Sequence, residues 1–487
     1  MTAVAEQTRT ERMPRAAASA PLGWLRERGM GASVLVAAIS AAFGAVLLSA
    51  TGFIAAVLRA DPFLGDSETL AVVLMILSVL LVGVAVYVAA VVTANTFSTV
   101  IAGRTRRIAL MRLIGASAQS QRAEVARQGL VVGVIGAFLG LIGGTALSAA
   151  GVAFAGAAFA IDVEYAVVQG VLVVPAVVVA LTTWAAAWVG SRRVLTVTPL
   201  QALGGSVEAS HESQAGRRRN GGAIALFVSG GALLAGGILL GLVTPFGVVV
   251  AFVGGILSFT GLAVGASLVL PPVLRLVGRL FGSSATARLA AENALRYPER
   301  SSRMAIGVVI GVTLVTMFAV ALESAKSVIA GSSGDGIEPE FAAIIDTFSG
   351  IMMVLVGVSA VIAAVGLVNL LTIGVVQRRR ELGLLRALGV SRGQVRGMVM
   401  REAAHITITA VVCGLVLGTA YGWAGAQSLL GSIAMPPAWQ SPTFVAPAIP
   451  WLPVVLIVIA TAVLTLVAAV VPTRLATRVA PVEALAE

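Results

Sequence analysis

Ten long apolar runs limit the folds that this sequence can adopt. Each has about the 20 residues that an α-helix needs to cross a bilayer, and they lie at 32–58, 70–97, 130–155, 166–189, 224–243, 246–270, 304–322, 351–375, 406–429 and 450–471. Only 11% of the 487 residues are charged, whereas a water-soluble domain carries about a quarter. We therefore expect an all-α polytopic membrane protein with about ten transmembrane helices.

Charged residues alternate between the connections in step with these runs. The odd-numbered connections carry acidic residues, opposed there only by Arg59 and Lys326, whereas the even-numbered connections and both ends of the chain carry all the other arginines. Because basic connections stay in the cytoplasm, we expect cytoplasmic termini in a multi-pass protein of a bacterial plasma membrane. Residues 1–30 would form a cytoplasmic tail before a retained first span. For 224–270, a re-entrant hairpin stays open as an alternative to two full spans.

The remaining composition argues against several classes of function. The net charge of +11 follows membrane orientation and does not indicate nucleic-acid binding; acidic lipid headgroups or an acidic cytoplasmic protein are the expected partners. His211 and His405 with the single Cys413 assemble no catalytic or metal-ligand pattern. Lys326 has no glycine-rich turn before it, so the chain has no phosphate-binding loop. The spans also lack mid-membrane charges, which argues against an ion-driven carrier. We expect no bound cofactor and no enzymatic activity in this chain.

Two charged segments, 103–128 and 377–402, repeat one another without a gap. Equivalent pairs are Arg106 and Arg380, Leu110 and Leu384, Arg112 and Arg386, Gly115 and Gly389 and, within the spans, Asn95 and Asn369. The units also end alike, at 199–203 and 481–485, with a slightly larger offset. Such a repeat predicts two four-span units in parallel orientation, related by a pseudo-twofold axis, around a two-span insert. The expected boundaries are a tail at 1–30, a first unit at 31–203, a cytoplasmic linker at 204–222, an insert at 223–271, an interfacial helix at 272–303 and a second unit at 304–487.

Each charged segment combines an apolar ridge, a glycine and a serine. One helical face carries Ile108, Leu110, Met111 and Ile114 in the first copy, and Leu382, Leu384, Leu385 and Leu388 in the second. Gly115 and Gly389 follow, where a helix stop favours positive φ, and Ser117 and Ser391 can cap the next helix, Ser391 in a capping box with Gln394. This predicts a helix, a glycine corner and a short returning helix, which together suit docking on a cytoplasmic protein. The alternative places the leucines among the lipid headgroups.

Two further sets of polar residues stand near or inside the spans. At 285–300, Arg288, Glu292 and Arg296 share one helical face opposite small apolar residues, which predicts an amphipathic interfacial helix ended by Pro298; a solvated helix beside the membrane is the alternative. Asn95 and Asn369 favour hydrogen bonds between helices, with substrate contact as the alternative.

Three stretches resemble the FtsX-like permease domain of ABC transporters: RRRELGLLRALGVSRGQV at 378–395, LAAENALRYPERSSRMAIGV at 289–308 and RLATRVAPVEAL at 474–485. The plan of four, two and four spans is similar to that of the ten-span permeases of bacitracin-efflux type. Two departures stand out. Arg107 replaces the glutamate found at Glu381, which implies unequal sites, and the connection at 324–350 is too short for the large external domain of those permeases.

The resemblance implies a separate cytoplasmic ABC ATPase, in two copies, which would carry the ATP and magnesium. Its contacts on this chain would be Arg106, Arg107, Leu110, Arg112, Gly115, Arg380, Glu381, Leu384, Arg386 and Gly389. A separate set of candidate site residues belongs to the interfacial entry helix: Arg288, Glu292, Asn293, Arg296 and Arg300. We expect a permease subunit that couples the ATPase to extraction or export of an amphiphile from the membrane, such as a lipid, a hydrophobic drug or an antimicrobial peptide. The alternative is a mechanotransmitting or sensory subunit that moves no substrate and regulates an extracellular partner or a membrane kinase.

Overall fold

The computed structural model describes residues 30–60, 114–159, 163–191, 215–279, 298–332, 386–434 and 444–478, with 110–111, 384, 441 and parts of 71–94 and 292–295. Every element in this part of the chain is helical. In chain order the elements are α1 (Met30–Ala60), α3 (Ala118–Phe159), the 3-10 helix η2 (Gly170–Leu172), α4 (Val173–Gly190), α7 (Ala215–Leu240), α8 (Gly247–Val264), α9 (Ala266–Gly278), α11 (Pro298–Ser332), α14 (Arg392–Leu430) and α15 (Trp451–Arg478).

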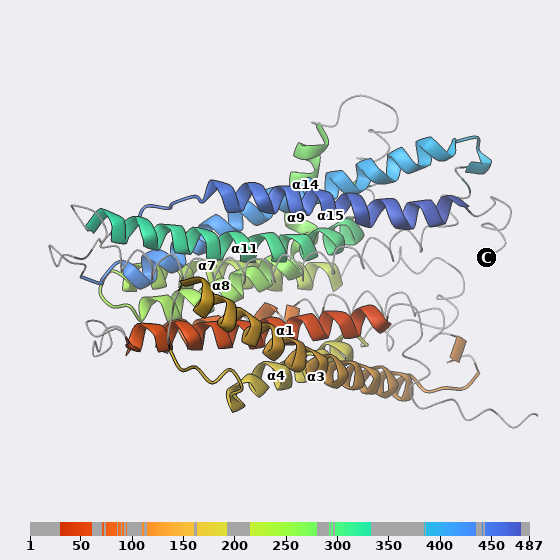
Figure 1. The fold of residues 1–487 in the computed structure, drawn as a ribbon. Coiled ribbons are helices and arrows are strands. Elements are labelled where there is room, and N and C mark those ends of the chain that lie inside the picture. Colours follow the sequence, from red (N-terminus) through yellow and green to blue (C-terminus); the bar gives the residue numbers. More distant parts are fainter. Residues whose placement is uncertain are drawn as a thin grey trace, which may run out of the picture.

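The helices lie lengthwise in one elongated bundle, as Figure 1 shows. Among the described residues, seven helices are long and apolar enough to cross a membrane, and shorter apolar helices cover 75–88, 266–278 and 451–463. The expectation of an all-α polytopic membrane protein is therefore confirmed. The expected span at 351–375 lies outside the described residues, so the count of ten stays a prediction.

The two units pack their first and third spans in the same way. On α3, a Cβ at Gly140 or Gly144 would overlap Ala38 and Ala42 of α1. On α14, a Cβ at Gly414 or Gly418 would overlap Val312 and Thr316 of α11. Each of these α1 and α3 residues is equivalent, in the internal repeat, to one of the α11 and α14 residues. The repeat found in the charged segments therefore extends to the closest helix contacts of both units.

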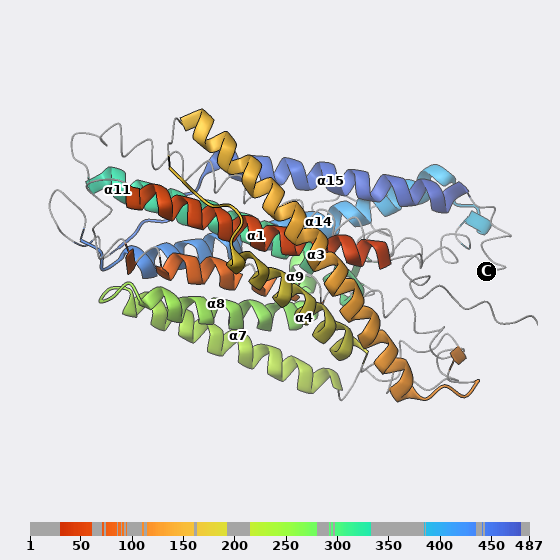
Figure 2. The same cartoon turned by 60° about the horizontal axis from the view of Figure 1, so that its bottom comes forward.

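The insert is a tightly packed pair of antiparallel helices, α7 and α8, joined by the turn 241–246 and seen side by side in Figure 2. Glycines bring the two backbones into contact, since a Cβ at Gly230, Gly237, Gly254 or Gly261 would overlap backbone atoms of the opposite helix. Helix α7 begins at Ala215, so the last residues of the expected linker at 204–222 are helical.

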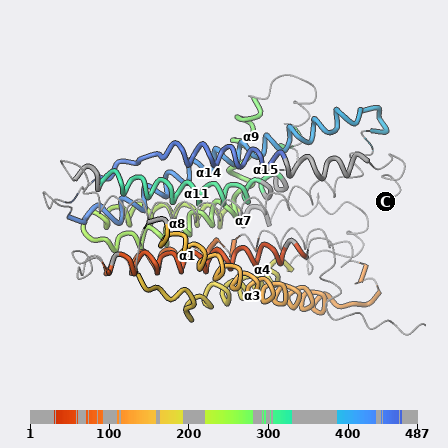
Figure 3. The backbone as a smooth tube through the Cα atoms, viewed as in Figure 1, coloured from red at the N-terminus to blue at the C-terminus, as the bar shows by residue number. Residues whose placement is uncertain are grey.

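The expected span at 246–270 is wrong at its end. Helix α8 stops at Val264, and at Gly265 the chain turns into α9, which leaves the direction of the other helices (Figure 3). Two adjacent prolines, Pro271 and Pro272, lie inside α9 and remove two helical hydrogen-bond donors. Because the run stays apolar through this point, hydropathy alone does not register the change of direction.

Helix α8 also joins the two units. The hydroxyl oxygen of Tyr87, from the first unit, lies 2.8 Å from Thr260 Oγ1, and that of Tyr421, from α14, lies 2.9 Å from Ser258 Oγ. The Phe259 ring stands edge-on to both tyrosine rings, with centroids 6.3 Å apart in each pair. Ser258 and Thr260 donate to carbonyls of their own helix, so both tyrosines act as donors to α8.

Candidate functional site

The first predicted corner forms around Gly115. This residue has a φ of 106°, and the Ala116 N–H donates to the Met111 carbonyl at 3.0 Å, the bond that closes a Schellman helix end. Ser117 Oγ then accepts the Ser120 N–H at 3.0 Å and caps α3. The glycine stop and the serine cap predicted from sequence are both confirmed.

The second corner repeats this geometry around Gly389, which has a φ of 95°. The Gly389 N–H donates to the Arg386 carbonyl at 3.1 Å. Ser391 Oγ accepts the Gln394 N–H at 3.2 Å, and Gln394 Oε1 accepts the Ser391 N–H at 2.9 Å, so the predicted capping box is present.

The helix that returns from each corner is not short, contrary to the expectation. Helix α3 has 42 residues and α14 has 39, which at 1.5 Å per residue makes each roughly 60 Å long. Each therefore runs without interruption from its corner through the bundle. A displacement at a corner would move a continuous rod rather than a hinged segment.

The apolar ridge is exposed to a similar degree at the two corners. Leu110 and its equivalent Leu384 expose 46% and 51% of their surface, and Ile114 and its equivalent Leu388 expose 80% and 74%. Helices α3 and α14 begin at the same end of the bundle, where α4 and α15 end (Figure 1). Paired exposed apolar ridges beside arginine-rich chain are typical of a surface that a partner covers.

The two corners differ in how their helices are held. The Arg122 guanidinium lies 4.1 Å from the centroid of the Trp188 ring and fastens the start of α3 to α4 by a cation–π contact. Glu124 next to it pairs with Arg127 at 2.9 Å. In the second unit the equivalent residues are Arg396, which is exposed, and Met398, which is buried. This difference adds to the predicted asymmetry at Arg107, which lies outside the described residues.

A buried histidine joins α14 to α9. His405 is 1% exposed and its Nε2 lies 2.6 Å from the carbonyl oxygen of Leu274. Helix α9 is also held by α11, where Ser302 Oγ donates to the Ala266 carbonyl at 3.2 Å. The sequence analysis found only that His405 belongs to no catalytic or metal-ligand pattern, because no local pattern signals a partner so far away along the chain.

The described part of the chain includes some of the predicted site residues. Leu110, Gly115, Leu384, Arg386 and Gly389 lie at the corners, Glu292 is exposed, and Arg300 belongs to the first turn of α11, which begins at Pro298. Ala294 of the interfacial segment is fully buried, and its carbonyl accepts Ser301 Oγ at 2.7 Å. The remaining predicted residues lie outside the described part of the chain: Arg106, Arg107, Arg112, Arg380, Glu381, Arg288, Asn293, Arg296, Asn95 and Asn369.

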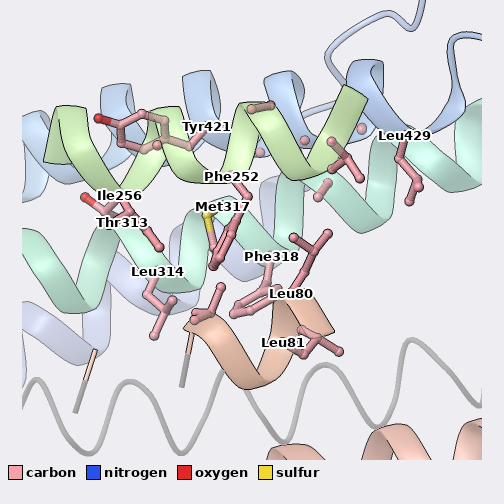
Figure 4. Close-up of a pocket in the computed structure, with 18 of the residues that line it drawn as sticks. Leu80, Leu81, Phe252, Ile256, Thr313, Leu314, Met317, Phe318, Tyr421 and Leu429 are labelled. Carbon is pink, nitrogen blue, oxygen red and sulfur yellow. The ribbon is translucent and has the colours of Figure 1, made fainter. Parts of the chain in front are cut away.

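A pocket of about 300 Å³ lies between the two units and the insert, and sequence reasoning did not anticipate it. Its walls come from residues 77–88, α7, α8, α11 and α14. Phe252, Met317 and Phe318 project into its middle, and Leu80, Leu81 and Leu429 lie around them (Figure 4).

Comparison with known proteins identifies the family. The model of the FtsX-like permease C-terminal domain matches residues 79–199 and 353–481, together just over half of the chain. The chain belongs to the FtsX-like permease family. The two matched segments start at equivalent positions of the internal repeat, 79 and 353, and end at its equivalent closing prolines, Pro199 and Pro481.

Three curated relatives match shorter stretches. The chain is 29% identical over 105 residues to the uncharacterized ABC transporter permease YknZ of Bacillus subtilis, an alignment covering 21% of this chain and 26% of YknZ. It is 33% identical over 79 residues to the ABC transporter permease YtrF of the same species, covering 16% of this chain and 17% of YtrF. It is 28% identical over 137 residues to the macrolide export ATP-binding/permease protein MacB of Rhodopirellula baltica, covering 28% of this chain and 18% of MacB. The chain thus aligns with about a quarter or less of the length of these relatives.

Proposed function

We propose that this chain is the membrane subunit of an ABC exporter, and that two copies of a separate cytoplasmic ATPase dock at the Gly115 and Gly389 corners. One observation carries the proposal: both corners keep their apolar ridges exposed to nearly equal degrees, at the same end of the bundle. The corners have helical ends fixed by positive-φ glycines and serine caps. They therefore present fixed surfaces to a partner.

Movement of an amphiphile out of the membrane is the work that this arrangement suits best. The α3 and α14 rods lead from the corners into the bundle, so an ATPase that binds two arrangements of the corners with different affinity would bias two arrangements of the spans. The apolar pocket beside α14 offers a place for an amphiphile inside the bundle. The similarity to MacB, whose name describes macrolide export, supports export as the direction.

The docking proposal is tested by placing a charge on each ridge. Ile114→Asp and Leu388→Asp should each lower the amount of ATPase that co-purifies with the chain, and the double variant should abolish it, because a buried unpaired carboxylate would cost several kcal/mol at the interface. Val243→Asp is the matched control, since Val243 is also 80% exposed but lies in the turn at the opposite end of the bundle.

Charge reversal gives a second measure of the same contact. Arg386→Glu and Arg112→Glu should also release the ATPase, and the loss should be larger at low salt than at high salt because dissolved ions screen the interaction between charges. Undiminished ATPase in preparations of the ridge double variant would refute docking at the corners. If the ridge double variant loses the ATPase but the export of amphiphiles is unchanged, the sensory function is supported and the export function is rejected.

A further inference from the structure

We infer that the pocket between α8, α11 and α14 holds one hydrocarbon chain of an amphiphile, taken from the half of the bilayer farther from the corners. This inference rests on the proposed function and names the part of the substrate that the permease recognises.

The position of the pocket in the bundle sets the half of the bilayer. Its α14 residues, 421–430, form the last turns of that helix, roughly 45 Å or more along the rod from the corner. Its α8 residues, 248–259, begin directly after the turn 241–246, at the end of the bundle opposite the corners. The pocket therefore extends from the middle of the bundle toward that opposite end.

The chemistry of the walls selects a hydrocarbon. Leucine, valine, isoleucine, phenylalanine and methionine side chains form most of the lining. The Tyr87 and Tyr421 hydroxyls are engaged with Thr260 and Ser258, so these residues do not offer free polar groups to a ligand. In Figure 4 the Tyr421 hydroxyl points away from Phe252 and Met317. Thr313 Oγ1 is buried and has no hydrogen-bond partner among the described residues, which makes it the group to test for polar recognition.

Two glycines, one on α8 and one on α14, leave open space in the lining of the pocket. A Cβ at Gly255 of α8 or at Gly425 of α14 would meet no atom within 4 Å, although both residues line the pocket. Their neighbours behave differently, because a Cβ at Gly254 would overlap α7 and one at Gly422 would overlap α11. Gly255 and Gly425 therefore have room for a Cβ, and we expect larger side chains at these positions to fill part of the pocket.

The size of the pocket limits the occupant further. Ligand sites usually enclose about 300 to 1,000 Å³, so a pocket of about 300 Å³ is at the small end. One extended chain fits such a volume better than a bulky multi-ring compound. Apart from residues 77–88, which belong to a shorter apolar helix, the walls belong to helices long and apolar enough to cross a membrane, so we expect bilayer lipids around the site.

The test is photocrosslinking of the full-length chain in nanodiscs of phosphatidylethanolamine and phosphatidylglycerol. One preparation contains phosphatidylglycerol with a diazirine in one acyl chain, and another contains a free fatty acid with the same diazirine. Mass spectrometry should find both labels on peptides that contain Phe252, Met317 or Phe318. Gly255→Leu and Gly425→Leu should each lower this labelling at least fivefold, whereas Gly236→Leu should not, because Gly236 has equally open space but lies outside the lining.

Other outcomes overturn the inference. Labelling that persists in both filled variants, or wild-type chain without label on the wall peptides, excludes hydrocarbon binding in this pocket. Loss of labelling in Thr313→Val, which keeps the side-chain shape, would mean that the ligand is recognised by a polar group. Labelling by the phospholipid but not by the fatty acid would still support the inference and would identify the occupant as a phospholipid acyl chain. Thermal unfolding of each variant verifies its fold, and co-purification of the ATPase is measured alongside, so failure of docking at the corners is seen separately from failure of the pocket.

Discussion

Substituting the corner glycine Gly389 separates the role of backbone shape from that of side-chain contact. Its φ of 95° costs an L-amino acid roughly 1–2 kcal/mol, and a Cβ there would meet no atom within 4 Å. Gly389→Ala therefore changes only the conformational preference of the corner. If the ATPase binds the corner in the described conformation, its affinity should fall about 5- to 30-fold, which is the same free energy expressed as an equilibrium constant.

A graded series and a nearby control sharpen this experiment. Asparagine tolerates positive φ better than other non-glycine residues, so the affinity should decrease in the order glycine, asparagine, alanine. Gly393→Ala lies in the first turn of α14, where the nearest atom to an added Cβ is 4.0 Å away, and it should stabilise the helix by about 0.5–1 kcal/mol without weakening docking. The affinity would be measured by surface binding of the purified ATPase to the chain in nanodiscs. Equal affinity for the glycine and alanine forms would refute the claim that the ATPase reads a preformed corner.

Two further substitutions test how the corner helices are held. Arg122→Gln should lower the free energy of unfolding by about 0.5–2 kcal/mol, because the cation–π contact with Trp188 is lost. Arg396→Gln, at the equivalent exposed position, should leave the unfolding temperature unchanged. Equal effects of the two substitutions would contradict the asymmetry between the corners. His405→Leu should destabilise α9 by about 1–3 kcal/mol, because the hydrogen bond to the Leu274 carbonyl is lost. Hydrogen exchange of the backbone amides at 266–278 should then become faster. Unchanged exchange rates would show that His405 does not hold α9.

The features that sequence predicted correctly are those decided by local chemistry. A glycine after an apolar ridge and a serine shortly before a glutamine determine a helix end and a helix start on their own, so the Gly389 corner with Ser391 and Gln394 was predictable. Because Gly115 is equivalent to Gly389 in the internal repeat, the same corner was predicted there. The all-α membrane fold was likewise predictable, because a long apolar run indicates a helix surrounded by lipid.

Features that sequence did not reveal depend on residues brought together by folding. Gly254 and Gly255 are neighbours with the same composition around them, yet one touches α7 and the other faces open space; only the position of α7 separates them. The contact between Arg122 and Trp188 has no counterpart in local spacing. Gly265 and the proline pair after it were visible signals for the end of α8, but a continuous apolar run outweighed them.

The helices that start at the two corners have different neighbours in the described part of the chain, where α14 packs on the insert and α3 packs mainly within its own unit. In the described part of the chain, α3 packs mainly on α1 and α4 of its own unit, and Arg122 ties its start to Trp188. Helix α14 instead contacts α7, α8 and α9 as well as its own unit, through His405 at Leu274 and Tyr421 at Ser258. It also supplies one wall of the pocket. If the ATPase docks as proposed, a stroke at the Gly389 corner would reach the pocket along one continuous helix, whereas α3, which starts at the Gly115 corner, supplies no residue of the pocket lining. Under the proposed docking, the two similar corners would act on the described pocket in unequal ways, and within the described residues the two-span insert is the element that breaks the symmetry of the repeat.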